Sequence, residues 1–413
     1  MKLHELTQWI HQIPNFEILT QTLQKTNQEI ILTGLSGSAK SFVLSSFYHL
    51  YPNALFVITG DDETAYSFAS DLKSFSGQDV LHYPGKEILP YEDMEPLVEL
   101  TAERIYVLQQ LHEYSLHPTQ NPPIVVISIR ELTEKTFPLS LFDAMTISLE
   151  FGNDYSMDEL TLKLAKSGYE RVPLVEQRGQ FAVRGGILDV FNITSSDPVR
   201  MEFFGNTLES IRTFRVSNQR SKEEIEKIVI YPASESELIG YSLSQNLPLV
   251  SLADYLPKQS FIVLDEALLI QEKQAEQINL FEERYQGLGK DKKENIQPSQ
   301  LTLSLDNFIE ESGSRNIIQF SLLQNPTPIK SNSDNIFQKD IPTRTVESYK
   351  GQFDRLIENI KTWQSEGYLV LLGCDNSGQK DRFSELLHEK EVFPEEFVHL
   401  QSGQQTYPIS LEI

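Results

Sequence analysis

Residues 176–216 read EQRGQFAVRGGILDVFNITSSDPVRMEFFGNTLESIRTFRV. Residues 180–191 and 199–204 are rich in β-branched and aromatic side chains, and a cluster of turn-forming residues at 192–198 separates them. Gly205 and Asn206 form a second turn signal, because both residue types tolerate the positive φ of a tight hairpin. Residues 208–216 then supply a further strand. The stretch therefore predicts a meander of short strands.

Three arginines, Arg178, Arg184 and Arg200, recur along this predicted sheet. The whole chain has 413 residues and is strongly acidic, with 35 basic and 59 acidic residues and a formal net charge of -24. A protein that binds nucleic acid broadly needs a basic stripe to neutralise phosphates. The composition therefore argues against a general DNA-binding surface. It makes a local basic face on the strand meander the candidate functional region.

The meander lies within a chain of α/β character. Buried-strand patterns at residues 29–33, 54–59, 79–82 and 123–128 alternate with helical patterns, which predicts a parallel sheet with helices on both faces. A helical pattern at 157–167 leads into the meander. The buried-strand pattern returns near residue 228. We therefore predict an α+β domain at residues 143–217, inserted between residues 1–142 and 218–318, which are two halves of one P-loop-like domain.

The last quarter of the chain has a different composition. Residues 325–345 are rich in Pro, Ser and Asn, so we expect them to be mobile and place a linker at 319–345. A helix, a strand and a helix are expected at 353–366, 368–372 and 380–390, which predicts a small α/β domain at 346–413. The sequence stops in a strand pattern, and we therefore expect more protein beyond Ile413.

The first strand runs into a glycine-rich loop that resembles a phosphate-binding loop. Residues 34–41 read GLSGSAKS, with Gly34, Gly37, Lys40 and Ser41 in the positions of the motif G-x-x-x-x-G-K-[ST] or close to them. Backbone amides of such a loop, and the helix that follows, can hold phosphates. Ala39 stands where the last glycine belongs. Nucleotide binding and a loop that only keeps the shape of such a site both remain open from the motif.

An apolar strand at residues 260–264 ends in Asp265 and Glu266. Such a pair can hold magnesium and polarise water in P-loop ATPases. Together with Lys40 and Ser41 it outlines a degenerate nucleotide site. Hydrolysis also needs charge stabilisation from a second side of the phosphates, and we expect no second lobe in these residues. We therefore predict no catalytic residues and no cofactor, with ATP and magnesium as the alternative.

Several classes of protein are disfavoured by composition. The single cysteine, Cys374, excludes an internal disulfide and a cysteine-rich zinc site, and the eight histidines show no metal-ligand spacing. No apolar run approaches 18 residues, and the N-terminus has an amphipathic helical pattern, not that of a signal peptide. We therefore expect a soluble, cytoplasmic protein without a metal site or membrane contact.

Five segments carry a family resemblance: TGLSGS (33–38), LPYE (89–92), RGQFAVRGGILDVF (178–191), RMEFFG (200–205) and RTFRVSNQRS (212–221). They resemble the N-terminal module of the bacterial transcription-repair coupling factors (Mfd), which is homologous to the excision-repair protein UvrB. The resemblance covers essentially the whole chain. The motif R-G-x-F-x-x-R-G-G-[IL]-[LV]-D-[LV]-F is its most specific part.

The chain departs from UvrB in two respects. UvrB carries a long, tyrosine-rich hairpin for DNA where this chain has the short segment 83–91. UvrB also has an intact P-loop and a D-E-x-H box, whereas Ala39 and Leu268 replace the corresponding Gly and His here. Both departures favour the coupling factors. The resemblance implies that the insert binds UvrA, and that RNA polymerase and DNA are bound by domains beyond Ile413.

Three functions therefore compete: an adaptor in nucleotide excision repair that recruits UvrA to stalled RNA polymerase, an ATP-hydrolysing module, and a UvrB-like damage binder. The adaptor fits the acidity, the short segment 83–91 and the degenerate loop. For it, the UvrA-binding candidates are Arg178 and Arg184, which match basic residues of the shared motif, with Arg171, which only lies beside the motif in sequence, and Phe191. The alternative is that the arginines pair with local acids, as we prefer for Arg171, and that Phe191 belongs to the core.

Overall fold

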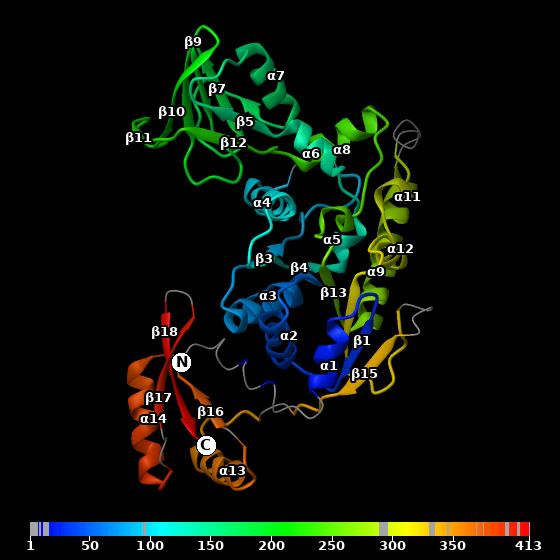
Figure 1. Ribbon diagram of the computed structural model, residues 1–413, viewed down its shortest axis with the longest axis vertical. Coiled ribbons are helices and arrows are strands. Elements are labelled where there is room, and N and C mark those ends of the chain that lie inside the picture. Colours follow the sequence, from blue (N-terminus) through cyan, green and yellow to red (C-terminus); the bar gives the residue numbers. More distant parts are fainter. Residues whose placement is uncertain are drawn as a thin grey trace.

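The computed structural model describes residues 7, 10, 16–92, 94, 96–288, 296–329, 335–344, 347–368, 370–374, 376–392, 396–402 and 405–412. Figure 1 shows three parts along the long axis of the molecule. The strand-rich insert lies at one end, a large sheet with its helices lies in the middle, and a C-terminal unit lies at the other end.

The middle part is built on a seven-stranded sheet of order β15-β1-β14-β13-β2-β4-β3. Each strand runs parallel to its neighbours. The five central strands are buried along their whole length, as expected of strands covered on both faces. The predicted parallel α/β sheet is confirmed. Its strands are β1 (Glu29–Thr33), β2 (Ala54–Thr59), β3 (Val80–Tyr83), β4 (Ile124–Ser128), β13 (Ser260–Asp265), β14 (Asn316–Ser321) and β15 (Ile336–Asp340).

Helices cover both faces of this sheet because successive side chains of a strand point to opposite sides. Leu55 and Val57 of β2 belong to one apolar core, and Phe56 and Ile58 belong to another. The first core is shared with α1 (Phe16–Leu23), α2 (Ala39–Leu50) and α3 (Asp62–Ser76). The second is shared with α4 (Val98–Leu116), α5 (Ile129–Thr133), α6 (Leu139–Met145), α8 (Glu235–Ser244), α9 (Ala267–Gly287) and α12 (Leu305–Glu311). The short helix α11 (Pro298–Leu301) precedes α12.

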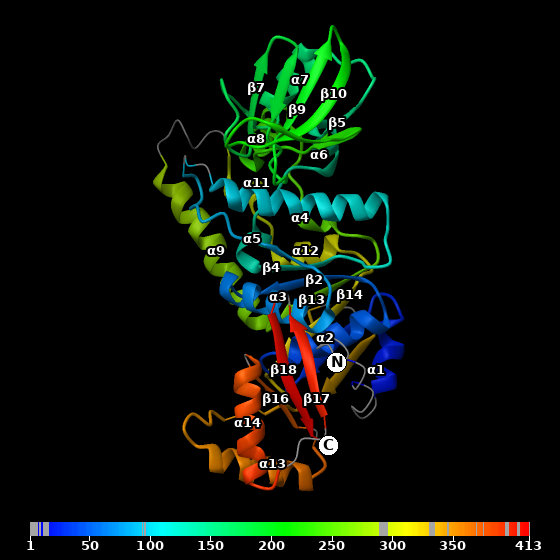
Figure 2. The ribbon, with the colours of Figure 1, turned by 90° about the vertical axis from the view of Figure 1, so that its left-hand side faces the viewer.

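The insert contains a six-stranded sheet of order β11-β10-β9-β8-β7-β6 and a two-stranded sheet of β12 and β5. The helix α7 (Met157–Lys166) packs Leu160 and Leu164 against one face of the larger sheet. This apolar core is continuous with that of the middle part, and Figure 2 shows α4 lying between the two. The strands are β5 (Ile147–Glu150), β6 (Glu170–Arg171), β7 (Gln180–Arg184), β8 (Ile187–Val190), β9 (Val199–Phe204), β10 (Thr207–Phe214), β11 (Ser221–Glu224) and β12 (Lys227–Ile230).

The predicted meander is present, with one difference. The turn at Gly205 and Asn206 joins β9 to β10, and Gly205 has a φ of 63°. Residues 180–191 were expected to be one strand but form two, β7 and β8, which pair antiparallel around Gly185 and Gly186. The sequence signal for this second turn was a Gly-Gly pair inside an apolar run.

Strand pairing bears on two of the predicted domain boundaries. β11 pairs with β10, and β12 pairs with β5, so residues 221–230 fold with the insert, which was expected to end at residue 217. The predicted linker, residues 319–345, contains β15, which pairs with β1 at the edge of the large sheet. Residues 330–334 and 345 of that linker lie outside the described residues. The division into domains remains a prediction.

The C-terminal unit has its own small core, formed by Ile357, Ile360, Leu387 and Val392. Two helices, α13 (Phe353–Ser365) and α14 (Ser377–Glu389), accompany an antiparallel sheet of order β16-β18-β17. The strands are β16 (Val370–Gly373), β17 (Glu396–Ser402) and β18 (Gln405–Glu412). Cys374 is buried beside β16.

Candidate functional site

The hairpin between β7 and β8 places Arg184 at the end of β7. Gly185 has a φ of 59°, in the left-handed region that favours glycine. A Cβ on Gly186 would lie 2.6 Å from the carbonyl oxygen of Phe203, and the Phe203 amide donates to the Gly186 carbonyl at 2.7 Å. The two glycines therefore make the turn and allow β9 to approach it closely.

One face of the six-stranded sheet carries Arg184, Arg200 and Arg212, and we call it the arginine face. Asp189 of β8 lies opposite Arg200 of β9, and Arg200 lies opposite Arg212 of β10. Asp189 also lies opposite Ala182, two residues before Arg184. Residues opposite each other in an antiparallel sheet share a face, as do residues two apart. The other face is apolar and packs towards α7, so the arginine face is turned away from that core.

Asp189 is the centre of the arginine face. Its side chain is completely buried. Arg200 donates from Nε and Nη2 to its two carboxylate oxygens at 2.7 and 2.8 Å, and Arg184 donates from Nη2 at 2.6 Å. The hydrogen bonds from Arg200 to Asp189 raise the pKa of Arg200. One carboxylate therefore serves two guanidinium groups, which leaves the cluster with a net positive charge.

The two arginines differ in accessibility. Arg200 is 17% exposed and lies 4.6 Å from the centre of the Phe214 ring, a cation–π distance. Arg184 is 47% exposed. A guanidinium group has five N–H donors in a rigid fork, so Arg184 can keep its bond to Asp189 and still offer donors to an outside carboxylate.

The other predicted partner-binding residues do not lie beside Arg184. Arg178, in the loop before β7, donates from Nε to the Ser195 carbonyl at 2.9 Å and lines a cavity of 390 Å³ between the insert, α4 and α8. Arg171 is exposed on the edge strand β6. Phe191 is buried in a small apolar cluster with Phe214, which favours the core interpretation of this residue.

Sequence reasoning missed Asp189. The available signal was an acid in the middle of the apolar strand ILDV. A carboxylate is rarely buried without a charged or hydrogen-bonding partner, so this position alone predicts a nearby cation. Which arginines serve it depends on the register of β7, β8 and β9, which the sequence does not fix.

The glycine-rich loop lies where the sequence places it, between β1 and α2. Gly34 and Gly37 have positive φ values of 80° and 54°. Ala39 is the first residue of α2, and Lys40 and Ser41 follow in the first turn. Because Ala39 is helical, replacing the motif's last glycine costs no left-handed strain here.

Lys40, Asp265 and Glu266 come together at the carboxyl ends of β1 and β13, as the motif predicts. Lys40 Nζ donates to Asp265 Oδ1 at 2.6 Å and to Glu266 Oε1 at 2.8 Å. Burial by itself would lower the pKa of Lys40, but the attraction of Asp265 and the two hydrogen bonds outweigh it and raise that pKa. The amide of Leu322 also donates to Glu266 Oε2 at 3.1 Å. The lysine and Glu266 therefore already have partners within the chain.

The segment after β15 lies against the start of the loop. Thr343 accepts a hydrogen bond from the Ser36 amide at 2.9 Å and donates to the Gly34 carbonyl at 2.8 Å. The Asp340 carboxylate accepts from the Thr33 hydroxyl at 2.8 Å. A Cβ on Gly34 would lie 2.9 Å from Asp340 Oδ1. These contacts fill space beside the loop and place a carboxylate there, which is unfavourable for a phosphate.

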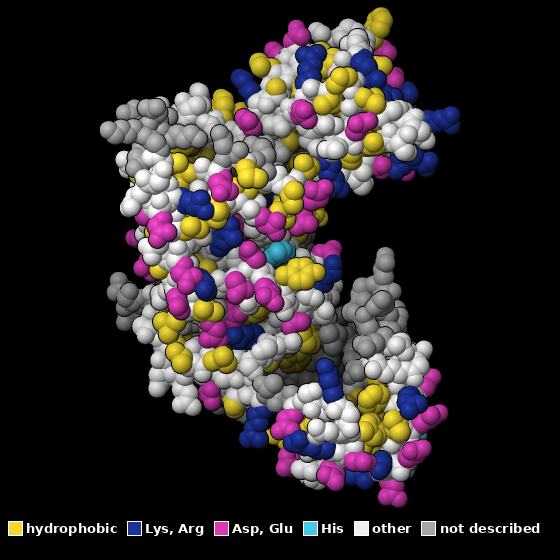
Figure 3. All heavy atoms as spheres, turned by 180° about the vertical axis from the view of Figure 1, so that it is seen from behind, with side chains coloured by type: hydrophobic (Ala, Val, Ile, Leu, Met, Phe, Trp, Pro, Cys, Tyr) yellow, Lys and Arg dark blue, Asp and Glu magenta, His cyan; other side chains and the backbone are white. Residues whose placement is uncertain are grey.

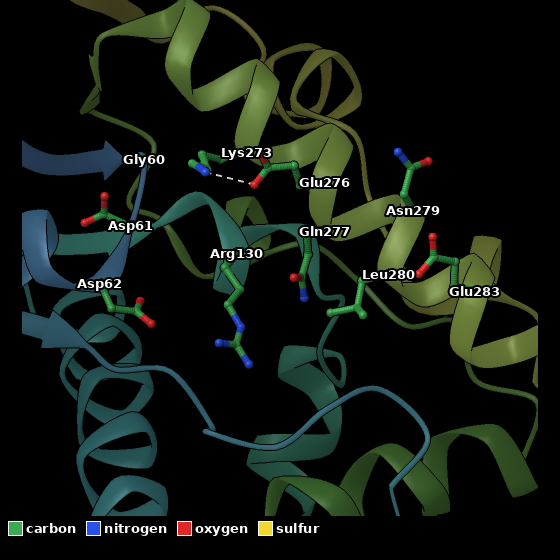
Figure 4. A pocket seen from close by; sticks show the side chains of 10 residues that line it. All are labelled: Gly60, Asp61, Asp62, Arg130, Lys273, Glu276, Gln277, Asn279, Leu280 and Glu283. Carbon is green, nitrogen blue, oxygen red and sulfur yellow. Dashed lines mark hydrogen bonds and ion pairs between the residues drawn. The ribbon is translucent and has the colours of Figure 1, made fainter. Parts of the chain in front are cut away.

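A cavity of 580 Å³ lies at the same edge of the sheet, beyond the end of β2. Figure 4 shows that Arg130 of α5 and Gln277 of α9 extend towards the same space, while Lys273 is held by Glu276 at 2.9 Å. Crevices at the carboxyl ends of parallel strands are common ligand sites. Here, however, acidic side chains outnumber basic ones, so the cavity does not extend the loop into a phosphate site. Its charged lining residues are Asp61, Asp62, Glu276, Glu283, Arg130 and Lys273.

Both the insert and the chain as a whole resemble known proteins. Residues 147–235 match the family model described as the UvrB interaction domain. The chain is 34% identical over 218 residues to the transcription-repair-coupling factor of Myxococcus xanthus, covering 51% of this chain and 18% of that protein. It is 24% identical over 437 residues to the factor of Bacillus subtilis (strain 168), covering 93% of this chain and 36% of the relative. It is also 24% identical over 422 residues to the factor of Escherichia coli (strain K12), covering 92% of this chain and 36% of that relative.

The predicted resemblance to the transcription-repair-coupling factors is confirmed. The chain spans about a third or less of the length of these curated relatives. The matched residues 147–235 contain the whole arginine face and extend past β12, in agreement with the strand pairing.

The surface around the insert has a mixed charge pattern. Figure 3 shows Lys and Arg side chains distributed over the insert, with Asp and Glu frequent on the middle part next to it, and a hollow between them.

Among the described helices, none is long and apolar enough to cross a membrane. Those residues also contain no group of three or more potential metal-binding side chains.

Proposed function

We propose that this chain is an adaptor module whose arginine face binds UvrA, and that its P-loop-like domain supports that face without hydrolysing ATP. The observation that carries the proposal is the Arg184–Asp189–Arg200 cluster. It presents a half-exposed cation on a sheet face turned away from the core, within a chain of net charge -24. Complementary charge of this kind raises the rate of encounter with an acidic patch and penalises wrong partners.

The match of residues 147–235 to the UvrB interaction domain supports an interaction role for the insert. The relatives are transcription-repair-coupling factors by name, which supports a role in recruiting excision repair to stalled RNA polymerase. We assign contacts with RNA polymerase and DNA to regions of the full protein outside these residues. An acidic middle part is a poor surface for DNA, which agrees with that assignment.

The geometry of the glycine-rich loop supports the absence of hydrolysis. Lys40 is neutralised by two carboxylates, and Glu266 is held at both oxygens, so neither is available without breaking ion pairs. Asp340 adds a negative charge beside the loop. In active P-loop enzymes, the lysine instead contacts the phosphates, and a residue from a second side stabilises the transition state by about 10³-fold or more.

A charge reversal tests the adaptor proposal. Binding of purified UvrA to the chain is measured by calorimetry for the wild type, Arg184→Glu and the matched control Arg382→Glu, which changes an exposed arginine of α14. Arg184→Glu should weaken binding by about 100-fold, since it replaces an attraction by a repulsion, and the control should not. Equal binding by all three proteins would exclude the arginine face as the UvrA site.

A further inference from the structure

The strand β3 leaves one edge of the large sheet open. Among the described strands it pairs with β4 alone, and Figure 1 shows it at one edge of the sheet beside α4. Val80, Leu81 and His82 are half-buried, whereas β4 is buried along its whole length. The backbone groups on the outer side of β3 are therefore accessible to a further strand.

The two edges of this sheet differ in their protection against such pairing. Proteins commonly prevent an edge strand from pairing with another chain by placing charges on it, especially lysine. The strand at the other edge, β15, reads IFQKD and carries Lys339 and Asp340. The strand β3 reads VLHY and contains neither a charged carboxylate, nor a lysine, nor a proline. Its sequence therefore leaves it able to pair.

A groove with a volume of 770 Å³ lies beside this edge. Leu81 and the two residues before β3, Gln78 and Asp79, form one side of it, and residues of α4 between Tyr106 and Leu116 form another. The strand β12 of the insert lies at the far side. Because the groove follows both β3 and α4, it suits an extended chain. The charged residues that line it are Asp79, Glu113 and Lys227.

Exposed tyrosines flank both faces of the open edge. Tyr106 of α4 is 43% exposed and lines the groove. Tyr66 of α3 is 70% exposed, and its ring centre lies 6.0 Å from that of His82. Successive side chains of a strand point to opposite faces, so the side chains of an added strand would meet the two tyrosines in alternation. The edge thus offers a backbone ladder and a side-chain contact on each face.

Acidic side chains lie at both ends of this edge. Burial lowers the pKa of His82, and the attraction of Asp62 and Glu103 offsets that effect only in part, so both carboxylates are near it. One oxygen of Asp62 has no hydrogen-bond partner among the described residues, and Glu103 is exposed. At the other end, the side chain of Asp79 is 92% exposed and contacts Lys73 at 3.2 Å. The edge therefore favours a partner with basic residues.

We propose that the open edge of β3 docks an extended segment of a partner protein, which adds a strand to the large sheet. Its side chains alternate between Tyr66 and Tyr106, and a basic residue lies near Asp62 and Glu103. In this mode of binding, main-chain hydrogen bonds give affinity and the flanking side chains give selectivity. A second copy of the chain fits less well, because each copy has a net charge of -24 and brings the same acids to the contact.

Fluorescence anisotropy with a labelled synthetic peptide tests the proposal on the complete chain. The peptide is about eight residues long, within the range of ordinary strands, with alternating valine and threonine in the centre and lysine at both ends. We expect a dissociation constant of about 100 µM or tighter. The same peptide with proline at its central positions should not bind, because proline cannot donate to the ladder.

Two matched variants locate the contact. Tyr106→Ala should weaken binding of the peptide by about fivefold, because one flanking contact is lost. Tyr368→Ala changes an exposed tyrosine of the C-terminal unit and should bind like the wild type. Both side chains are exposed, so both variants should fold. Hydrogen exchange gives a second measurement: the peptide should slow exchange of the amides of residues 80–83 and not of residues 336–340.

Absence of binding would overturn the proposal, and so would equal binding of the proline peptide or equal weakening by the two variants. Binding without protection of residues 80–83 would overturn it as well, because the peptide would then lie elsewhere. Sedimentation of the chain alone tests the other occupant. A dimer that the peptide dissociates would assign the edge to a second copy and contradict the assignment to a partner protein.

Discussion

Asp189 explains why the arginines of the insert are arranged as they are. A buried carboxylate needs compensation, and the bidentate contact from Arg200 supplies it within the fold. Arg184 adds a third hydrogen bond from the exposed side. The two arginines therefore have different tasks: Arg200 stabilises the sheet, and Arg184 is available to a partner.

This division predicts unequal effects on stability. Asp189→Asn leaves two neighbouring arginines without their carboxylate and should lower the free energy of unfolding by about 3–5 kcal/mol. Arg184→Ala leaves Asp189 paired with Arg200 and should cost about 0–1 kcal/mol. Urea denaturation of both variants measures the difference. Similar losses would show that Arg184 is needed for the fold.

Lys40 is expected to act as a structural residue. We predict that the wild-type chain releases no phosphate from ATP above background, and that Lys40→Ala gives the same background rate. The same variant should melt at a lower temperature, because Asp265 and Glu266 lose their cation at a buried site. Steady-state phosphate release by the wild type, abolished by Lys40→Ala, would show an active ATPase instead.

At the scale of elements, a buried ionic network joins the return from the insert to the large sheet. Arg104 of α4 donates to Glu131 of α5 at 2.6 Å and to Glu235 of α8 at 3.0 Å. It also donates to the hydroxyl of Tyr83, at the end of β3, at 2.7 Å. Because α8 follows the insert directly, this network fixes one of the two connections between the insert and the middle part.

Glu131 gives this network a pH dependence. Burial, only partly offset by the attraction of Arg104, raises its pKa from 4.5 to about 7. Between these values the folded state binds more protons than the unfolded state. The contribution of Glu131 to stability is therefore complete below pH 4.5 and is lost as the pH rises through about 7. Lys86, Arg130 and Glu134 also act on this group.

Glu131→Gln tests the assignment because the amide cannot titrate. From pH 5 to 7 the wild type should lose up to about 1.4 kcal/mol of unfolding free energy per pH unit relative to the variant. Denaturation curves of the two proteins at pH 5, 6, 7 and 8 provide the comparison. A constant difference across this range would mean that Glu131 keeps one protonation state. Glu134, whose pKa is lowered, should contribute its full stabilisation above about pH 4.5 and lose it as the pH falls below that value, so it does not vary between pH 5 and 8.

The sequence predicted elements better than their long-range contacts. Uninterrupted apolar runs such as ALFVIT and IVVIS were enough to predict the parallel strands, and the turn signal at Gly205 was enough to predict one hairpin. The pairing of β15 with β1 was not predictable, because its burial alternates and it lies in a polar, Pro-rich segment. The contact of Thr343 with the glycine-rich loop was missed for the same reason, since it joins residues 307 positions apart.

At the scale of the whole molecule, the segment before the C-terminal unit should be the first to be cleaved. Limited proteolysis is expected to cut first within residues 319–345. The exposed residues Leu322 and Leu323 should be cut before β15, because β15 is paired with β1. The large fragment should keep its fold. First cleavage within the insert or within α13 would contradict this arrangement, and mass spectrometry of early fragments identifies the sites.

The charge of the molecule determines how a partner would be recognised. In an acidic chain, the half-exposed Arg184 on the arginine face favours encounters with an acidic partner at that face. If Arg184 lay at the rim of the complex, its effect should be small and should vanish at high salt. If it contacts a desolvated carboxylate of UvrA, its loss should persist at high salt.

The affinity of UvrA for Arg184→Ala, measured beside the melting temperature of the same variant, tests the adaptor role most directly. We predict that the dissociation constant rises by about thirtyfold or more, which corresponds to about 2 kcal/mol, while the melting temperature stays close to that of the wild type. An unchanged dissociation constant would contradict the account. So would a loss of affinity accompanied by a matching loss of stability, because Arg184 would then serve the fold and not the partner.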